Sequence, residues 1–307
     1  MKDIFKTARA LHIYGICAIA VSFACIVFRL LATLFFFDVD IGYYRSGSIV
    51  AIIASYLPAI AALASLVICA VSKISVIPAE PRNTKAVRIC ALFPALGFIG
   101  YSVIYAISTV EYYGLYGELP LLYILMLAAS VISAVFFALL ALKKNVGDAY
   151  FAVSGIFLII WLIISLAESY FDSFVQMNSP IKMIFQFATL SAVLLAVNEL
   201  RVDLEVKKPR FHLFAATVAT VFLGTSSIPS IICSFTGHMP TSYILFYSDC
   251  ILLLLFVFSA ARLCQLCFTK DGAHGSAVVE EPAEGEAYEY SAQDSGDKDV
   301  SAEAQDI

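Results

Sequence analysis

The sequence predicts an all-α polytopic membrane protein, with about eight transmembrane helices in a bundle and a disordered acidic C-terminal tail. Three observations support this fold class. First, 61% of the 307 residues are hydrophobic and only 14% are charged, whereas a soluble domain is about half apolar and about one quarter charged. Second, eight separate apolar runs are long enough to cross a bilayer. Third, the basic residues between these runs gather in alternate loops. A soluble domain of this length could not bury so much apolar surface and still present a wettable face.

The eight apolar runs define a transmembrane domain over residues 1–270. A hydrocarbon core requires about 20 apolar residues per helix. The first run follows Lys2, Lys6 and Arg9, but it is too long for a signal-peptide core and has no clear small-residue cleavage site. We therefore expect it to be a retained signal anchor. The runs lie near residues 11–37, 48–72, 87–110, 119–142, 150–170, 180–199, 211–233 and 241–267.

The basic residues between the runs and at their ends predict the orientation, because cytoplasmic loops carry an excess of Lys and Arg. Fifteen of them precede the first run, lie in the even-numbered loops, or lie at the inner end of the last run and beyond it: Lys2, Lys6, Arg9, Lys73, Arg82, Lys85, Arg88, Lys143, Lys144, Arg201, Lys207, Lys208, Arg210, Arg262 and Lys270. The other loops hold only Arg45 and Lys182. We therefore expect a multi-pass protein of the cell membrane with both termini in the cytoplasm.

Residues 271–307 form a separate acidic segment. They hold eleven of the 24 acidic residues and a single basic one, Lys298. With Tyr288 and Tyr290 as its only aromatic residues, the segment cannot bury enough apolar surface to fold, so we expect it to be disordered. It is either a solvating tether or a docking segment for a basic cytosolic protein. The remaining 18 basic and 13 acidic residues are usual for a membrane domain beside anionic lipid and indicate no nucleic-acid binding.

Four prolines recur at nearly equal intervals. Pro58, Pro120, Pro180 and Pro240 are 62, 60 and 60 residues apart, each in the outer part of an even-numbered helix or just before it. This spacing is compatible with four tandem helical hairpins related as a parallel repeat. Proline is also favoured in the first turn of any helix, so spans of similar length produce the same spacing without duplication. Both interpretations stay open.

Polar residues recur at helical spacing in five of the runs, so each set shares one face of its helix. Small and hydroxylated residues line helix interfaces in any polytopic protein, and bundle packing is therefore the plain interpretation. The other interpretation is a polar site at membrane depth. The sets are Ser22, Cys25, Arg29 and Thr33; Gly97, Tyr101, Tyr105, Ser108 and Tyr112; Trp161, Ser165, Glu168 and Asp172; Ser179, Lys182, Gln186 and Thr189; and Thr217, Thr220, Gly224 and Ser227.

Arg29 and Asp249 are the two deepest charges. Each lies eight residues from the outer end of its run, which places both about 12 Å below the outer surface. A charge at this depth costs several kcal/mol unless it is paired or hydrated. Equal depth and opposite charge predict a buried ion pair, which is either a structural bridge between the first and last helices or part of a ligand or proton site.

Three further charges lie nearer the outer surface. Glu168, Asp172 and Lys182 are on the facing ends of the fifth and sixth helices. Snorkelling at the interface would explain them at little cost. However, all five charges belong to the outer half, the inner half shows no comparable set, and the carboxylates exceed the cations by one. We therefore expect a pocket that is open to the outside and modestly favours cations or proton-linked binding.

The seventh run carries a glycine- and serine-rich segment that ends in proline. Pro229 lacks a backbone donor, and the small residues before it allow a helix to bend or break. Interrupted helices often line transport sites, although kinked helices without a function are commoner. The residues of this expected helix break are Gly224, Ser226, Ser227 and Pro229.

The charged residues that follow the sixth run predict a solvated connector. Pairs at i and i+4, such as Asp203 with Lys207, would stabilise it. It contains Asn198, Glu199, Arg201, Asp203, Glu205, Lys207 and Lys208.

No motif in the chain supports catalysis. The sequence contains no HExxH, no paired CxxC and no Walker loop. Cys264 and Cys267 have metal-ligand spacing, but no second pair and no nearby histidine accompanies them, so ordinary helix positions are the better interpretation. Eight cysteines in or beside apolar runs make a disulfide framework unlikely. We expect no metal and no cofactor, and an enzyme is the less favoured of the two interpretations.

Two functional hypotheses follow. The first is transport or sensing of a small molecule or ion through an outward-facing polar pocket, with Arg29 and Asp249 as its floor and Glu168, Asp172, Lys182 and Gln186 as its walls. The second is a non-catalytic membrane scaffold, or a subunit of a larger complex, whose charges only hold helices together and whose acidic tail contacts a partner.

Overall fold

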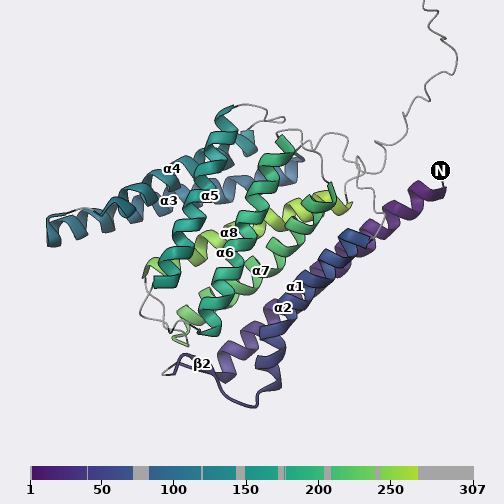
Figure 1. Ribbon diagram of the computed structural model, residues 1–307, viewed down its shortest axis with the longest axis horizontal. Coiled ribbons are helices and arrows are strands. Elements are labelled where there is room, and N and C mark those ends of the chain that lie inside the picture. The colour runs from purple at the N-terminus through teal and green to yellow at the C-terminus, as the bar shows by residue number, and fades with distance from the viewer. Residues whose placement is uncertain are drawn as a thin grey trace, which may run out of the picture.

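The computed structural model describes residues 2–39, 41–71, 83–118, 120–142, 149–171, 176, 178–203, 209–238 and 243–268. Within these residues the chain forms eight α-helices and one two-stranded β-hairpin (Figure 1). The elements are α1 (Lys2–Phe36), β1 (Phe37–Asp38), β2 (Tyr43–Tyr44), α2 (Ile49–Val71), α3 (Lys85–Tyr116), α4 (Leu121–Leu142), α5 (Ala149–Phe171), α6 (Pro180–Asp203), α7 (Pro209–Phe235) and α8 (Tyr243–Phe268).

All eight helices are long and apolar enough to cross a membrane, so the predicted all-α polytopic fold is confirmed. Most predicted boundaries agree with the helix ends to within a few residues. The exceptions are α1, which begins nine residues before its apolar run, α3, which continues to Tyr116, and α6, which continues to Asp203. Hydropathy ends a run where charged residues begin, but a helix continues as long as its backbone hydrogen bonds do. The acidic segment 271–307 lies outside the described residues.

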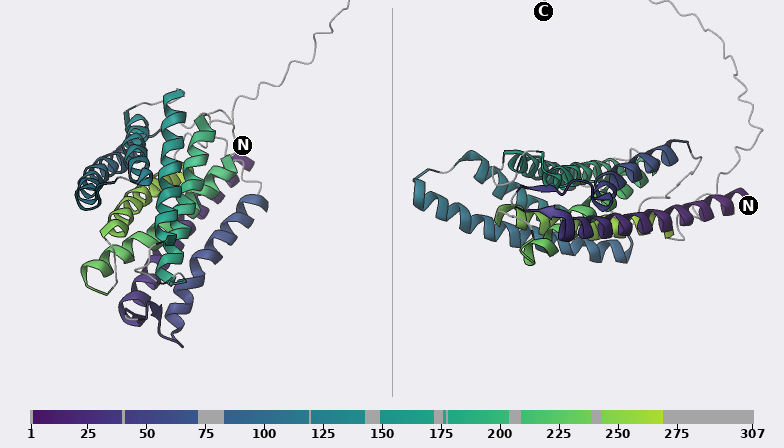
Figure 2. Two further views of the ribbon diagram at one scale, coloured as in Figure 1. Left: turned by 60° about the vertical axis from the view of Figure 1, so that its left-hand side comes forward. Right: turned by 90° about the horizontal axis from the view of Figure 1, so that it is seen from below.

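The helices form a flattened bundle with α7 and α8 at its centre. Helix α7 contacts α1, α2, α6 and α8, and α8 contacts α3 as well. The α1–α2 pair lies along one side and the α3–α4 pair along the other (Figure 1). Seen from below in Figure 2, the bundle is much thinner than it is long. Helix α7 accordingly has the largest buried share of any span.

The two ends of the bundle are named here the hairpin end and the termini end. The hairpin end holds β1 and β2, the C-termini of the odd-numbered helices and the N-termini of the even-numbered ones. The termini end holds the start of α1 and the end of α8 (Figure 1). The hairpin pairs Phe37 with Tyr44, and Gly42 closes its turn at φ +77, a left-handed conformation that glycine adopts without strain.

The prolines do not occupy equivalent positions in the helices. Pro180 is the first residue of α6 and Pro120 directly precedes α4, whereas Pro58 lies in the interior of α2. Pro240 lies outside the described residues. The first-turn preference of proline therefore accounts for Pro120 and Pro180 but not for Pro58. The two helices of each predicted hairpin are in contact (α1 with α2, α3 with α4, α5 with α6, α7 with α8). However, α4 also packs on α5, and α6 on α7. Internal duplication stays a prediction.

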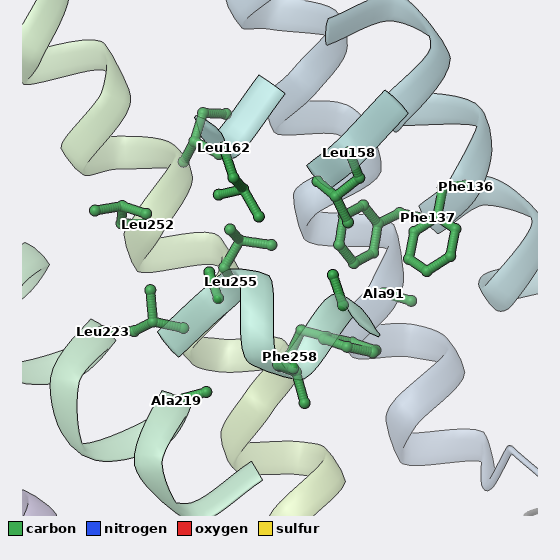
Figure 3. Close-up of a cluster of buried hydrophobic side chains, with 14 of the residues drawn as sticks. Ala91, Phe136, Phe137, Leu158, Leu162, Ala219, Leu223, Leu252, Leu255 and Phe258 are labelled. Carbon is green, nitrogen blue, oxygen red and sulfur yellow. The ribbon is translucent and has the colours of Figure 1, made fainter. Parts of the chain in front are cut away.

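A continuous apolar core joins α3, α4, α5, α6, α7 and α8. Figure 3 labels side chains of this cluster that converge from α3, α4, α5, α7 and α8. Phe136 stacks on Phe151 with ring centroids 4.5 Å apart, and Phe98 meets the edge of Trp161 at 4.9 Å. Within the cluster a cavity of about 10 Å³ is lined by nine apolar residues and by Glu199, which is space for about one water molecule.

Candidate functional site

Glu168 is the first member of a buried polar group at the hairpin end. It lies in the last turn of α5, and its Oε1 accepts a hydrogen bond of 3.2 Å from the Tyr105 hydroxyl of α3. Its second oxygen, Oε2, is buried and has no hydrogen-bond partner. Among the described side chains no cation pairs with it. One of the two carboxyl oxygens therefore accepts no hydrogen bond, although an uncompensated charge inside a membrane costs free energy.

Aromatic rings extend from Glu168 in two directions along α3. Toward the core, Tyr105 stacks on Tyr101 at 5.5 Å, and Tyr101 meets Trp161 edge-on at 5.3 Å. Toward the hairpin end, Tyr105 lies 5.5 Å from Tyr123 of α4, which in turn lies 5.1 Å from Tyr112. The ring series thus leads from a partly exposed tyrosine at the hairpin end to a fully buried tryptophan.

Two further polar atoms in this ring series lack partners. The hydroxyl of Tyr101, which is 4% exposed, lies beside Ser248 without a hydrogen bond of standard geometry. The indole Nε1 of Trp161 is also buried and unpaired. Buried donors of this kind are rare in folded proteins. Together with Glu168, they mark this region as one whose polar groups are not satisfied by the chain itself.

Asp249 is the second carboxylate of the hairpin end. It lies in α8, next to Ser248, and is 3% exposed. The Ser230 side chain of α7 lies near it, and its Oδ1 is buried without a hydrogen-bond partner. The hydroxyl of Ser226, one turn deeper on α7, is likewise buried and unpaired. Asp249 thus resembles Glu168 in having a buried carboxyl oxygen without a hydrogen-bond partner.

The expected break in the seventh helix does not occur. Helix α7 is continuous from Pro209 to Phe235, with Pro229 inside it. Thr225 and Ser227 bond back to the carbonyls of Val221 and Leu223 at 2.6 and 2.7 Å, which satisfies hydroxyls inside a membrane helix. The segment is glycine- and serine-rich because it is tightly packed: a Cβ added at Gly224 would lie 2.7 Å from the Phe256 ring.

Arg29 serves a different part of the hairpin end. It is 4% exposed, and its guanidinium donates to the carbonyl of Pro180 at 2.9 Å and lies 5.3 Å from the centre of the Tyr44 ring. The Ser179 hydroxyl donates to the carbonyl of Gly42 at 2.9 Å. These contacts fasten α1 and the β-hairpin to the start of α6.

The expected ion pair between Arg29 and Asp249 is therefore absent from the described side chains. The two residues contact different elements, the Arg29 side chain reaching α6 and β2 and the Asp249 side chain reaching α7. Lys182 is buried at the start of α6 and has an interaction partner. Gln186 is partly buried one turn further along α6, and Asp172 lies outside the described residues. The two residues of the predicted floor, Arg29 and Asp249, thus do not bond to each other, and Glu168 of the predicted walls bonds to Tyr105 of α3.

A second polar cluster, missed by sequence reasoning, lies toward the termini end. Glu199 of α6 is 5% exposed. Its two oxygens accept from Arg262 of α8 at 2.8 and 2.6 Å, and Oε1 also contacts Nε2 of His212 of α7 at 3.0 Å. Arg262 further donates to Asn83 at 3.0 Å and to Gln265 at 2.7 Å. We call these five residues the Glu199 cluster.

The Glu199 cluster corrects two expectations. Glu199 is not part of a solvated connector, and the inner half of the predicted topology does have a set of buried charges. Both Glu199 oxygens are hydrogen-bonded, so this cluster is internally complete. Part of this cluster could have been found in the sequence, because Glu199 and His212 lie on either side of the α6–α7 connection. Their partner Arg262 is 63 positions from Glu199, and no periodicity links the two.

Comparison of the chain with protein-family models, with curated proteins and with solved structures finds no match. The features that indicate a function are therefore the Glu199 cluster and the polar groups around Glu168. One is complete within the chain, whereas the other leaves carboxylate, phenol and indole groups without partners at membrane depth.

Proposed function

We propose that this protein binds a small cation from the hairpin end, and transports it across the membrane or senses it there. The observation that supports this proposal is the Oδ1 of Asp249, which has no hydrogen-bond partner. Asp249 is 3% exposed, and no cationic side chain among the described residues forms an ion pair with it. Glu168 repeats the pattern with its free Oε2. A carboxylate at this depth is stable only when a proton, a cation or water compensates its charge.

The predicted orientation gives this site its direction. The basic residues that the structure describes toward the termini end are Arg9, Lys85, Arg88, Arg201, Arg210 and Arg262, against Arg45 and Lys182 at the hairpin end. By the positive-inside rule the termini end faces the cytoplasm. The site at Glu168 and Asp249 then faces the outside of the cell membrane, and the Glu199 cluster lies on its cytoplasmic side.

Neutralising either carboxyl group tests the proposal. We expect Asp249→Asn and Glu168→Gln each to weaken cation binding about tenfold or more, because losing one charge contact of about 1.4 kcal/mol changes an affinity tenfold. The measurement is binding and flux of radiolabelled Na⁺, K⁺ and tetramethylammonium, and of protons by an enclosed pH dye, with the purified protein in liposomes.

Glu111→Gln is the matched control, since Glu111 is an exposed carboxyl group on α3, toward the hairpin end of the bundle. It should bind and transport as the unchanged protein does. Elution as a single species in detergent verifies that each variant is folded. Binding without flux would assign the protein to sensing. Equal binding by all three variants and the unchanged protein, or no binding of any cation, would overturn the proposal.

The alternative function is a non-catalytic scaffold or subunit of a larger complex. The Glu199 cluster favours it, because charges that are completely hydrogen-bonded within the chain only hold α6, α7 and α8 together. The acidic segment 271–307 would then contact the partner. This alternative predicts that neutralising Glu168 or Asp249 changes stability alone.

A further inference from the structure

We propose that the cation is an organic ammonium ion, held at Glu168 against the tyrosine rings of α3 and α4. This inference rests on the proposed cation-binding function and adds the class of ligand. It follows from the kind of groups that surround Glu168, which are aromatic faces and few oxygens.

The rings beside Glu168 range from partly exposed to buried. Tyr105 and Tyr123 are inclined at 33° with centroids 5.5 Å apart, and Tyr123 and Glu168 are each only partly buried, so a ligand can reach them from the hairpin end. Tyr101 and Trp161 are 4% and 0% exposed and lie beneath them. The Glu168 carboxyl group lies near all three tyrosines and accepts a hydrogen bond from Tyr105.

This lining suits an alkylated ammonium better than a metal ion. Hard cations such as Ca²⁺ and Mg²⁺ require six or more oxygen ligands, and the described residues contain no group of three or more His, Cys, Asp or Glu side chains that could hold a metal. An alkylated ammonium needs no such shell. It is attracted by ring faces within about 6 Å of their centroids, and one carboxylate balances its charge.

An aromatic belt is the competing explanation, since Tyr and Trp gather at both membrane interfaces. It accounts for Tyr113 and Tyr116, which are 53% and 67% exposed at the tip of α3. It does not account for Tyr101 or Trp161, which are buried and whose polar atoms lack partners. Those two rings lie deeper than a carboxyl group that also has a free oxygen, and ring faces beside a carboxylate are the groups that bind an ammonium ion.

The protein carries its own probe for this site. Trp161 is the only tryptophan of the chain, and it contacts Tyr101 directly. Titrating the full-length protein in detergent with tetramethylammonium chloride should change the Trp161 emission saturably. Glu168→Gln should weaken this binding at least about tenfold, and Tyr123→Leu about two- to fivefold, as expected for one cation–π contact.

Three comparisons make the test specific. Tyr113→Leu, which removes an exposed tyrosine of the neighbouring helix α3, should leave the titration unchanged. tert-Butanol, a neutral molecule of similar size to tetramethylammonium, should not produce the emission change. If Glu168→Gln does not fold, as judged by circular dichroism, Tyr123→Leu against Tyr113→Leu decides the question.

The outcomes separate the two proposals. If Na⁺, K⁺ or protons alter the Trp161 emission in a Glu168-dependent way while tetramethylammonium does not, the ammonium inference is overturned and the cation-binding function stands. An equal response to tert-butanol also overturns the inference, because the site would then be merely apolar. If no cation acts on the unchanged protein or on either variant, both proposals fail.

Discussion

Replacing Arg262 with alanine is expected to destabilise the protein by about 3–5 kcal/mol, the usual cost of removing one partner of a buried ion pair. Arg262 is 2% exposed and bonds to both oxygens of Glu199. Without it, the Glu199 charge would be buried beside the apolar cavity with only His212 in reach. Asn83 and Gln265 would also lose their bonds to Arg262. Thermal unfolding in detergent, followed by circular dichroism, measures the effect.

Arg201→Ala is the matched control for Arg262. Arg201 belongs to the same end of the bundle but is partly exposed, and its guanidinium lies 5.6 Å from the centre of the Phe211 ring. Its loss should cost about 0.5–1 kcal/mol, the value of an exposed cation–π contact. The double variant Arg262→Met with Glu199→Met should recover much of the lost stability, because no unpaired charge remains. Similar unfolding temperatures for the two arginine variants would contradict the structural importance of the Glu199 cluster.

The second large effect is expected from Gly15→Leu, which should destabilise the bundle by about 1–3 kcal/mol or more through overpacking. A Cβ added at Gly15 would lie 2.6 Å from the Cβ of Cys267. A Cβ atom is fixed to its backbone, so it cannot rotate away as the end of a long side chain can. The leucine must therefore force α1 away from α8, and thermal unfolding in detergent should show a lower transition temperature.

Gly100→Leu provides the control for Gly15→Leu. A Cβ at Gly100 would meet nothing within 4 Å, and the residue is exposed on α3. Replacing glycine within a helix gains up to about 1 kcal/mol of helix propensity, so this variant should be at least as stable as the unchanged protein. If Gly15→Leu were tolerated equally well, the close approach of α1 and α8 would be wrong.

Much of the fold could be predicted because it depends on local properties of the chain. Apolar runs of sufficient length specify membrane helices, and the number of helices follows directly. Charges end a hydropathy window but not a helix, which is why α6 extends beyond residue 199 to Asp203 and why Glu199 was assigned to a loop. Pro229 illustrates the opposite error, since a residue that disfavours helices is tolerated inside α7.

The candidate site was predictable in its residues but not in their pairing. Glu168 and Asp249 stand out in the sequence because charges are rare at membrane depth. Their partners depend on which helices become neighbours, and sequence spacing carries no information about that. Arg29 bonds to Pro180, 151 residues away, rather than to the carboxylate at the same depth. Likewise, the sequence shows the row of tyrosines on α3 but not that Tyr123 and Glu168 lie beside Tyr105.

The bond between Arg29 and the carbonyl of Pro180 also has a consequence for how the protein is made. Helix α1 is synthesised before α6. Arg29 therefore lacks its acceptor until the 151 residues between them have been made. At about 5–20 residues per second, this interval lasts about 8–30 seconds. During that time an arginine within the first span adds about 2.5–3.5 kcal/mol to the free energy of membrane insertion. The long apolar stretch of α1, whose span runs from Arg9 to Phe36, offsets this cost and holds the helix in the bilayer until α6 arrives.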